Sequence, residues 1–179
     1  YDLGAFVKPL CSWYEKNKRS MPWREQKGAY EVWISEIMLQ QTRIEAVKGY
    51  YDRFLKRLPA VKDLAEIPQE ELMKLWEGLG YYNRARNLQK AAQKVQDEYD
   101  GVLPADYEKL KSLPGIGNYT AGAIASIAYK IPAPAVDGNV MRVTMRLLGC
   151  RDDIMKGSVR NLQTKRMINS IRGRFRKKF

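Results

Sequence analysis

Apolar residues recur every three or four positions along most of the chain, whereas the apolar–polar alternation typical of β-strands is nowhere sustained. The clearest stretches are 30–40, 44–55, 68–76, 83–99 and 118–129. Further stretches begin at Pro9, cover 106–111, and run from Asp137 to Gly149. The pattern predicts a helix for each stretch and therefore an all-α fold class.

Residues of particular types mark the expected ends of these helices. Thr42 and Glu45 have the spacing of a capping box, which predicts a helix start between them. Gly78 and Gly80 are expected to stop the helix that Pro68 begins. Asp137 begins the last of these stretches and is expected to be the N-cap of its helix.

The absence of histidine excludes several kinds of site. Without His among its 179 residues, the chain has no Ser-His-Asp triad, no Cys-His dyad and no His-ligated metal. Two cysteines, Cys11 and Cys150, make neither a disulfide framework nor a four-thiolate cluster, and they fit a reduced compartment. No apolar stretch has the length of a membrane span and no signal peptide is found, so we expect no membrane partner. The length allows one domain or two small lobes, and the first residue is not Met, as in a fragment.

Positive charge is concentrated at one end of the chain. The formal net charge is +12, and nine Lys or Arg residues follow Ile154 without an acidic residue, which leaves +3 for the first 153 residues. Such a balance favours a polyanionic partner, although it is mostly a property of the tail. Within the tail, Ile168, Ile171, Phe175 and Phe179 are spaced as one face of an amphipathic helix.

The turn Leu113-Pro114-Gly115-Ile116-Gly117 is a candidate phosphate site. Its two glycines allow a sharp turn and the close approach of a ligand to the backbone. The next helix begins at once, so its unpaired N–H groups and positive dipole end face the turn. One phosphate would be bound there without regard to base sequence. A plain turn between two helices explains the pentapeptide equally well.

Two carboxyl groups suggest acid–anion chemistry. Glu36 lies in an almost entirely apolar predicted helix, where burial disfavours the charged form and suits a general acid near neutral pH. The alternative is a Glu at the helix rim that pairs with Lys or Arg. A capping carboxylate at Asp137 accepts backbone N–H bonds, which favour its ionised form. Cleavage of a glycosidic bond needs such a pair, an acid for the leaving group and an anion for the cationic sugar. Capping alone is the simpler role for Asp137.

Four motifs in order carry a family resemblance: Ser35–Thr42, Gly78–Leu88, Leu113–Ala123 and Val136–Val140. From Phe6 to Asp153 the chain closely resembles the catalytic core of the MutY family of adenine DNA glycosylases, which are helix-hairpin-helix glycosylases. The resemblance implies two helical lobes with the active site in the cleft between them. Residues 20–128 would form one lobe, ending in the helix-hairpin-helix, and 1–19 with 129–179 an incomplete second lobe.

The resemblance also implies roles for individual residues. Glu36 would protonate N7 of an extruded adenine, Asp137 would stabilise or trap the cationic sugar, Asn139 would orient Asp137, and Tyr119 would support the site. Endonuclease III-like relatives have a Schiff-base-forming Lys at the position of Tyr119, so no strong AP-lyase activity is expected. The implied substrate- and DNA-binding residues are Trp23, Arg24, Gln41, Thr42, Tyr81, Leu113, Gly115 and Gly117, and the hairpin carbonyls would hold a monovalent cation.

The implied function is base excision repair by a monomer that acts on double-stranded DNA with adenine opposite 8-oxoguanine or guanine. Most of the family carries a [4Fe–4S] cluster on four cysteines that are absent here, as is the domain that recognises 8-oxoguanine, so we expect no cofactor in this chain. The enzyme would work with the nucleoid in bacterial cytoplasm, or in the nucleus or mitochondria of a eukaryote. The alternatives are an inactive DNA-binding core and a glycosylase for mismatched thymine or uracil.

Overall fold

The computed structural model describes residues 3–25, 28–154 and 156–175. Throughout these residues the regular elements are helices, which confirms the all-α prediction. The helices belong to two compact units, one of Ser20–Ala135 and the other of Tyr1–Arg19 with Val136–Phe179. The sequence placed the second boundary at 128/129, before the loop that contains Pro132 and Pro134. None of the described helices is long and apolar enough to cross a membrane.

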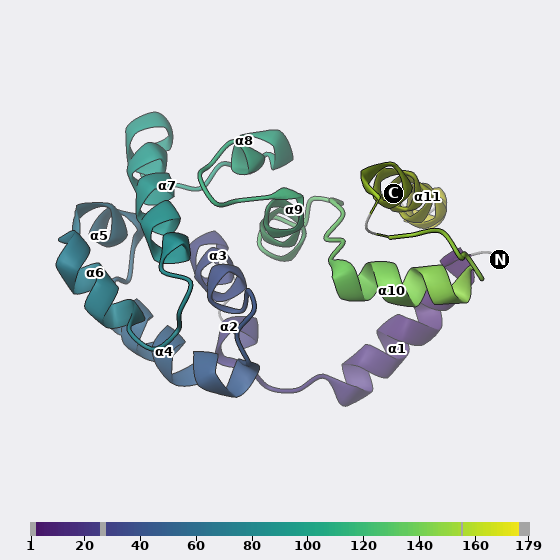
Figure 1. The fold of residues 1–179 in the computed structure, drawn as a ribbon, viewed down its shortest axis with the longest axis horizontal. Helices are drawn as coiled ribbons and strands as arrows, with labels where there is room; N and C mark the ends of the chain where they lie inside the picture. Colours follow the sequence, from purple (N-terminus) through teal and green to yellow (C-terminus); the bar gives the residue numbers. More distant parts are fainter. Residues whose placement is uncertain (1–2, 26–27, 155, 176–179) are drawn as a thin grey trace. The chain divides into compact units, whose positions relative to one another are not determined.

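The Ser20–Ala135 unit is built around one buried helix, α3. Its helices are α2 (Pro22–Glu25), α3 (Ala29–Met38), α4 (Ile44–Arg57), α5 (Val61–Glu66), α6 (Gln69–Trp76), α7 (Asn83–Tyr99), α8 (Tyr107–Lys111) and α9 (Asn118–Ile127). α3 contacts α2, α4, α7 and α9 (Figure 1). Trp33, Ile34 and Met38 of α3 have no exposed surface, and Phe54 and Trp76 meet edge to face in the same core. A helix that is apolar nearly all round is stable only when surrounded in this way.

The long helix α7 follows its sequence pattern closely. Ala85, Leu88, Ala91, Ala92 and Val95 recur at helical spacing and are all buried, and the helix has the bounds expected, Asn83–Tyr99. It ends where Asp100 and Gly101 take left-handed conformations, with φ of 51° and 75°. Both N–H groups reach back to the carbonyl of Val95, which satisfies an end of the helix that would otherwise lack partners.

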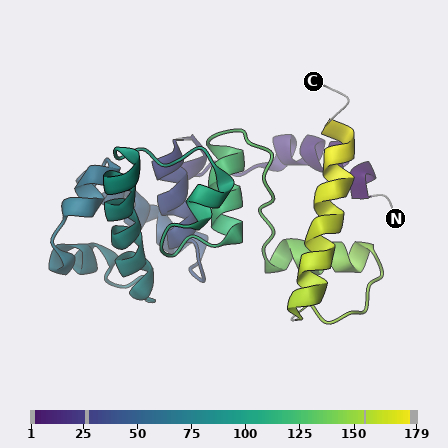
Figure 2. The same ribbon diagram turned by 90° about the horizontal axis from the view of Figure 1, so that it is seen from above.

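The second unit contains η1 (Leu3–Phe6), α1 (Val7–Asn17), α10 (Gly138–Leu147) and α11 (Gly157–Phe175). Met141 and Met145 of α10 pack against Ile154, Val159 and neighbouring residues. α11 contacts both α10 and η1, and Figure 2 shows it as one long helix. On the apolar face expected for the tail, Ile168 is partly buried, whereas the side chains of Ile171 and Phe175 and all of Phe179 lie outside the described residues.

One expected helix end was wrong, and two short helices were missed. Thr42 and Glu45 form no capping box, because α4 begins at Ile44 with Arg43 as a cap that makes no side-chain bond, and the Thr42 hydroxyl bonds elsewhere. The four-residue helix α2, Pro22–Glu25, is not among the stretches predicted from the sequence. The six-residue helix α5 was missed, since one and a half turns are too short for periodicity and α5 is stabilised by packing on α7.

Gly122 in α9 predicts a large effect on stability. A Cβ at this position would overlap the carbonyl oxygen of Pro134, a backbone atom that cannot swing aside. Gly122→Ala should therefore lower the free energy of unfolding by about 1–3 kcal/mol, despite the higher helix propensity of Ala. Chemical denaturation measures this loss.

The matched control is Gly49→Ala in α4, where the added methyl group meets only Arg53 at 3.4 Å. This substitution should raise the free energy of unfolding by about 0.5–1 kcal/mol. Equal stabilisation by both substitutions would contradict the predicted overlap.

Candidate functional site

Glu36 lies on α3, the most buried helix of its unit. Its neighbours Ser35 and Ile37 are buried, and the Ser35 hydroxyl is turned inward to donate to the carbonyl of Val32 at 2.8 Å. The Glu36 side chain is itself partly exposed. Glu36 therefore stands at the edge of an apolar core, with part of its surface in contact with solvent. The placement fits both interpretations that the sequence left open, a general acid and a Glu at the helix rim, and the role of Glu36 as an acid stays a prediction.

Tyr119 lies on a helix that packs against α3. It is the second residue of α9, and 36% of its surface is exposed. Because α3 and α9 are in contact, the helices that carry Glu36 and Tyr119 are neighbours in one rigid core. The phenol at this position offers a hydroxyl group and no amine. It can donate or accept a hydrogen bond, but it cannot form a Schiff base.

The turn before α9 is built by Gly115 and anchored by apolar residues. Gly115 has φ of 76°, and a Cβ there would lie 2.9 Å from Cβ of Asn87, so the position demands glycine twice over. Gly117 differs from our expectation because its backbone is extended and needs no glycine; its missing side chain instead leaves open space. Leu113 and Ile116 are buried, which places Leu113 in the core as an anchor of the turn.

The start of α9 has the features expected of a phosphate site. The N-cap residue Gly117 has no side chain with which to cap the first turn, and both Gly117 and Asn118 are exposed. Backbone N–H groups in a first helical turn lack intrahelical partners and carry partial positive charge. The turn is therefore able to bind an anion through its backbone. Binding of a monovalent cation by the carbonyls of this hairpin stays a prediction.

In the other unit, Asp137 and Asn139 form a hydrogen-bonded pair. Asp137 is the N-cap of α10, as predicted, and its Oδ1 accepts a bond from the backbone N–H of Val140 at 2.7 Å. Asn139 Nδ2 donates to the second oxygen, Oδ2, at 3.1 Å. Both oxygens of the carboxylate thus accept hydrogen bonds, which fixes its orientation. That is the relation between the two side chains that the sequence motif implied.

Trp23 and Arg24 lie at the edge of the core formed by α2, α3 and α4. Trp23 is 8% exposed and meets the ring of Tyr51 edge to face, with 5.5 Å between centroids. Arg24, next to it, is exposed. Trp23 therefore has at least a packing role, and its expected role in a pocket for adenine stays a prediction.

Gln41 and Tyr81 lie in two separate loops and share an unusual backbone conformation. Both are non-glycine residues with positive φ, 56° for Gln41 and 46° for Tyr81, and both side chains are exposed. Thr42, beside Gln41, is partly buried and accepts a hydrogen bond from Arg84. Arg84 joins the two loops, and sequence reasoning assigned it no role although it lies within one of the motifs.

The candidate residues fall on both units. Glu36, Tyr119 and the DNA-binding candidates lie in Ser20–Ala135, whereas Asp137 and Asn139 lie in the other unit. Within the first unit the structure brings together the helices of Glu36 and Tyr119, and within the second it brings together Asp137 and Asn139. That the two groups face each other across a cleft stays a prediction.

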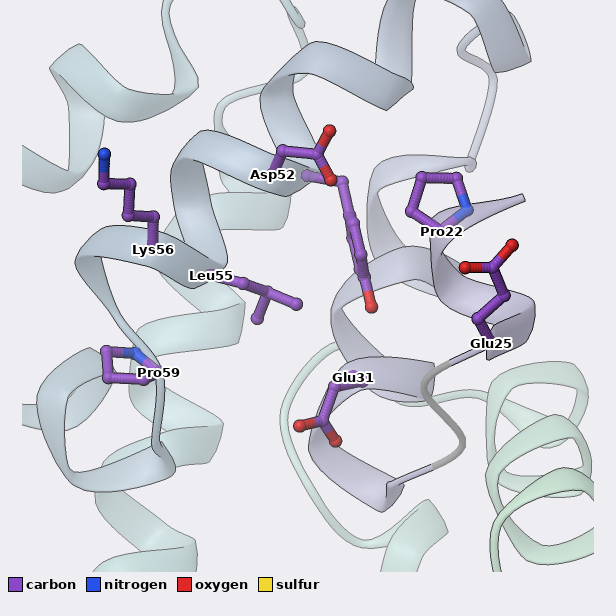
Figure 3. A pocket seen from close by; sticks show the side chains of 8 residues that line it. Pro22, Glu25, Glu31, Asp52, Leu55, Lys56 and Pro59 are labelled. Carbon is purple, nitrogen blue, oxygen red and sulfur yellow. The ribbon is translucent and has the colours of Figure 1, made fainter. Parts of the chain in front are cut away.

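A hollow of about 470 Å³ lies at the amino-terminal end of α3, where Glu31 is among the residues that line it (Figure 3). Carboxylates reach its walls from three helices, Glu25 of α2, Glu31 of α3 and Asp52 of α4, and Lys56 is the one cation among the described residues that line it. Net negative charge disfavours the approach of a phosphate backbone. We therefore expect nucleic acid to bind elsewhere on this unit.

The residues present do not fit an iron–sulfur cluster. The chain has two cysteines in all, whereas a cubane cluster is held by four thiolates. Cys11 is exposed on α1, and Cys150 is engaged with Asp152 at 3.1 Å and with Gln163 at 3.6 Å. Within the described ranges no three His, Cys, Asp or Glu side chains are grouped so as to hold a metal.

Comparison with known proteins gives concordant matches. Residues 34–167 match the family described as HhH-GPD superfamily base excision DNA repair protein. The adenine DNA glycosylase of Rattus norvegicus is 48% identical over 155 residues, which cover 82% of this chain and 30% of the rat protein. That of Buchnera aphidicola subsp. Baizongia pistaciae is 42% identical over 143 residues, 79% of this chain and 41% of the relative. The chain thus spans well under half of the length of these relatives.

Solved structures match over nearly the whole chain. A thermostable thymine-DNA glycosylase aligns with a TM-score of 0.81 and 28% identity, covering 93% of this chain and 82% of that one. A trapped endonuclease III–DNA covalent intermediate aligns with a TM-score of 0.77 and 28% identity, covering 93% and 75%. The helical architecture described above is therefore shared with both enzymes, of which the endonuclease III was solved as a covalent intermediate with DNA.

Proposed function

Because the chain belongs to the HhH-GPD superfamily of base excision DNA repair proteins, we propose that it is the catalytic core of a monofunctional DNA glycosylase. Its substrate is adenine opposite 8-oxoguanine or guanine in duplex DNA. The observation that carries the proposal is the placement of Glu36, a partly exposed carboxyl group on a buried helix that packs against the helix of Tyr119. Identities of 42–48% with adenine DNA glycosylases support the choice of base.

The proposed chemistry divides acid and anion between two carboxyl groups. Glu36 gives a proton to N7 of the extruded adenine, and the bond between the sugar and the base breaks with both electrons leaving on the base. Asp137, oriented by Asn139 at 3.1 Å, stabilises the positive charge that remains on the sugar. Water then adds to the sugar and releases a proton, which restores the acid. The products are free adenine and an intact strand with an abasic site.

Duplex DNA is the proposed partner, and the turn before α9 is the proposed phosphate contact. Gly115 shapes the turn and Gly117 leaves the backbone open, so that the phosphate is bound by N–H groups without base readout. The solved relatives in complex with DNA support this partner. The chemistry uses only side chains of this chain, and two cysteines leave no place for a [4Fe–4S] cluster within its 179 residues.

Single-turnover release of base from four matched duplexes tests the proposal. The duplexes carry adenine opposite 8-oxoguanine, adenine opposite guanine, G·T and G·U. Release of adenine alone is the expected result. Release of thymine or uracil would favour a second candidate function, a glycosylase for mismatched thymine or uracil. The TM-score of 0.81 with a thymine-DNA glycosylase is the observation that favours this candidate. Tight binding of every duplex without release would identify a core that binds DNA and has no activity.

The product is expected to be an abasic site without strand cleavage. Tyr119 has no amine with which to form the Schiff base that drives cleavage in bifunctional enzymes. Borohydride should therefore trap no covalent enzyme–DNA complex, and the strand should stay intact until alkali is added. A bifunctional glycosylase assayed in parallel shows that the trap works. Trapped complex in an amount comparable to the adenine released would contradict the prediction.

A further inference from the structure

Arg84 is the second residue of α7, and its guanidinium group binds two loops at once. Within the described part of the chain, its two terminal nitrogens together donate hydrogen bonds to six oxygens. Nη1 reaches the carbonyls of Ile37, Met38 and Gln40 at 2.5–3.0 Å, and Nη2 reaches Thr42 Oγ1, Leu79 O and Gly80 O at 3.0–3.3 Å. The first four oxygens belong to the end of α3 and the turn after it, and the last two to the loop before α7.

This arrangement satisfies backbone groups that helix geometry leaves without partners. The last carbonyls of an α-helix have no intrahelical donor, and α3 ends at Met38. The loop before α7 contains three residues with positive φ, Gly78, Gly80 and Tyr81. Its carbonyls are therefore not aligned for the regular hydrogen bonds of a helix. Burial lowers the pKa of Arg84 from its ordinary value, but an arginine still stays protonated. The group is thus a permanently charged, planar donor between the two loops.

The same guanidinium holds aromatic rings in place. Its carbon lies 5.4 Å from the ring centre of Trp76, which has no exposed surface, and 5.5 Å from that of Tyr81, which is 62% exposed. Such cation–π contacts stabilise both partners. Trp76 in turn donates from Nε1 to the carbonyl of Gly80 at 3.1 Å. Tyr81 is therefore presented to solvent from a support that is itself anchored in the core.

Gln41 and Tyr81 need such a support because their backbones are strained. Positive φ is uncommon for residues with a Cβ, and it persists only where the surroundings enforce it. Arg84 binds the residues on both sides of Gln41, through Gln40 O and Thr42 Oγ1, and the two residues before Tyr81. Both strained positions are thus fixed by one side chain.

We propose that Arg84 is a positioning residue that holds Gln41 and Tyr81 in the conformations with which they enter the base stack and keep the target nucleotide extruded. The proposal rests on the proposed function. Arg84 touches no substrate; it acts through the two exposed side chains. Lysine cannot replace it, because a single ammonium group with three hydrogens cannot span six oxygens on two loops.

Base extrusion is measured directly by the fluorescence of 2-aminopurine placed beside the target adenine, together with single-turnover release of adenine. The variants of the 179-residue chain are Arg84→Lys, Tyr81→Ala and the double variant. Arg84→Lys should reduce both the fluorescence amplitude and the release rate by at least about tenfold. The double variant should be no slower than the slower single variant, because two residues that act as one unit are not additive.

The matched control is Arg57→Lys, the same exchange at a half-exposed guanidinium that bonds Glu71 at 2.6 Å. It should leave extrusion and release unchanged. Melting curves are recorded on every variant. If Arg84→Lys does not fold, Trp76→Phe removes the bond to Gly80 O and should reduce extrusion by a smaller factor.

Two results would overturn the inference: unchanged extrusion in the folded variant, or losses from Arg84→Lys and Tyr81→Ala that multiply. If the wild-type chain itself releases no adenine, the proposed function fails. If the wild-type chain releases adenine, and Arg84→Lys and Trp76→Phe extrude and release it equally well, only the proposed role of Arg84 fails.

Discussion

Glu36→Gln should slow the release of adenine by about 10²–10⁴-fold while duplex binding stays within a few-fold of wild type. Glutamine has the shape of glutamate but no proton to give, so the leaving base departs as an anion. Single-turnover kinetics with adenine opposite 8-oxoguanine measures the loss, and titration with the same duplex measures binding. Melting curves should be nearly unchanged, since the Glu36 side chain is only partly buried at the edge of the core.

The control for this substitution lies on the same helix. Glu31→Gln exchanges the same groups at the amino-terminal end of α3, where the carboxylate lines the acidic hollow. It should leave the release of adenine unchanged. Loss of activity in both variants would point to a general effect of charge on α3, and full activity of Glu36→Gln would remove Glu36 from the mechanism.

Asp137→Asn should slow release by about 10²–10³-fold, a loss typical of removing one electrostatic contact from a transition state. Asparagine is as good an N-cap as aspartate, so α10 should keep its first turn and the chain its stability. The negative charge near the sugar is lost, and one hydrogen bond goes with it, because asparagine has a single acceptor oxygen where Asp137 accepts from both Val140 and Asn139. The rate is measured under single turnover, and thermal denaturation shows that the cap is kept.

Asp106→Asn is the matched exchange at a second capped helix. Asp106 accepts a bond from the backbone N–H of Lys109 at 2.8 Å at the start of α8, in the way that Asp137 caps α10. The Asp106→Asn variant should release adenine at the wild-type rate. If Asp137→Asn is as active as Asp106→Asn, Asp137 is a helix cap and nothing more.

The helices and their local ends followed from neighbouring residues. The bounds of α7 and the cap at Asp137 depend on residues within one or two turns, and both predictions were confirmed. The capping box at Thr42 failed for the opposite reason. Its hydroxyl accepts a bond from Arg84, 42 positions further along the chain, and no local pattern records that competitor.

The family and its motif residues were also evident from the sequence, because four motifs in the same order are specific to one family. Glu36 could be selected as an unusual residue, since a carboxyl group in an apolar helix contradicts the pattern around it. Arg84 could not, because an arginine near the start of a polar-faced helix is ordinary. Its importance arises from oxygens contributed by Ile37 through Gly80, which only folding brings to one point.

The amino-acid order of this chain thus determined its helices, its family and the chemical types available for catalysis, since each depends on residue identity and short spacing. Tertiary packing decided which of those residues are core, which are exposed and which are held in place. Leu113 and Trp23 became buried supports, whereas Gln41 and Tyr81 are exposed in strained conformations. The physical reason is that periodicity reports the face of one helix, while a hydrogen-bonded arginine between two loops depends on the three-dimensional meeting of distant backbone groups.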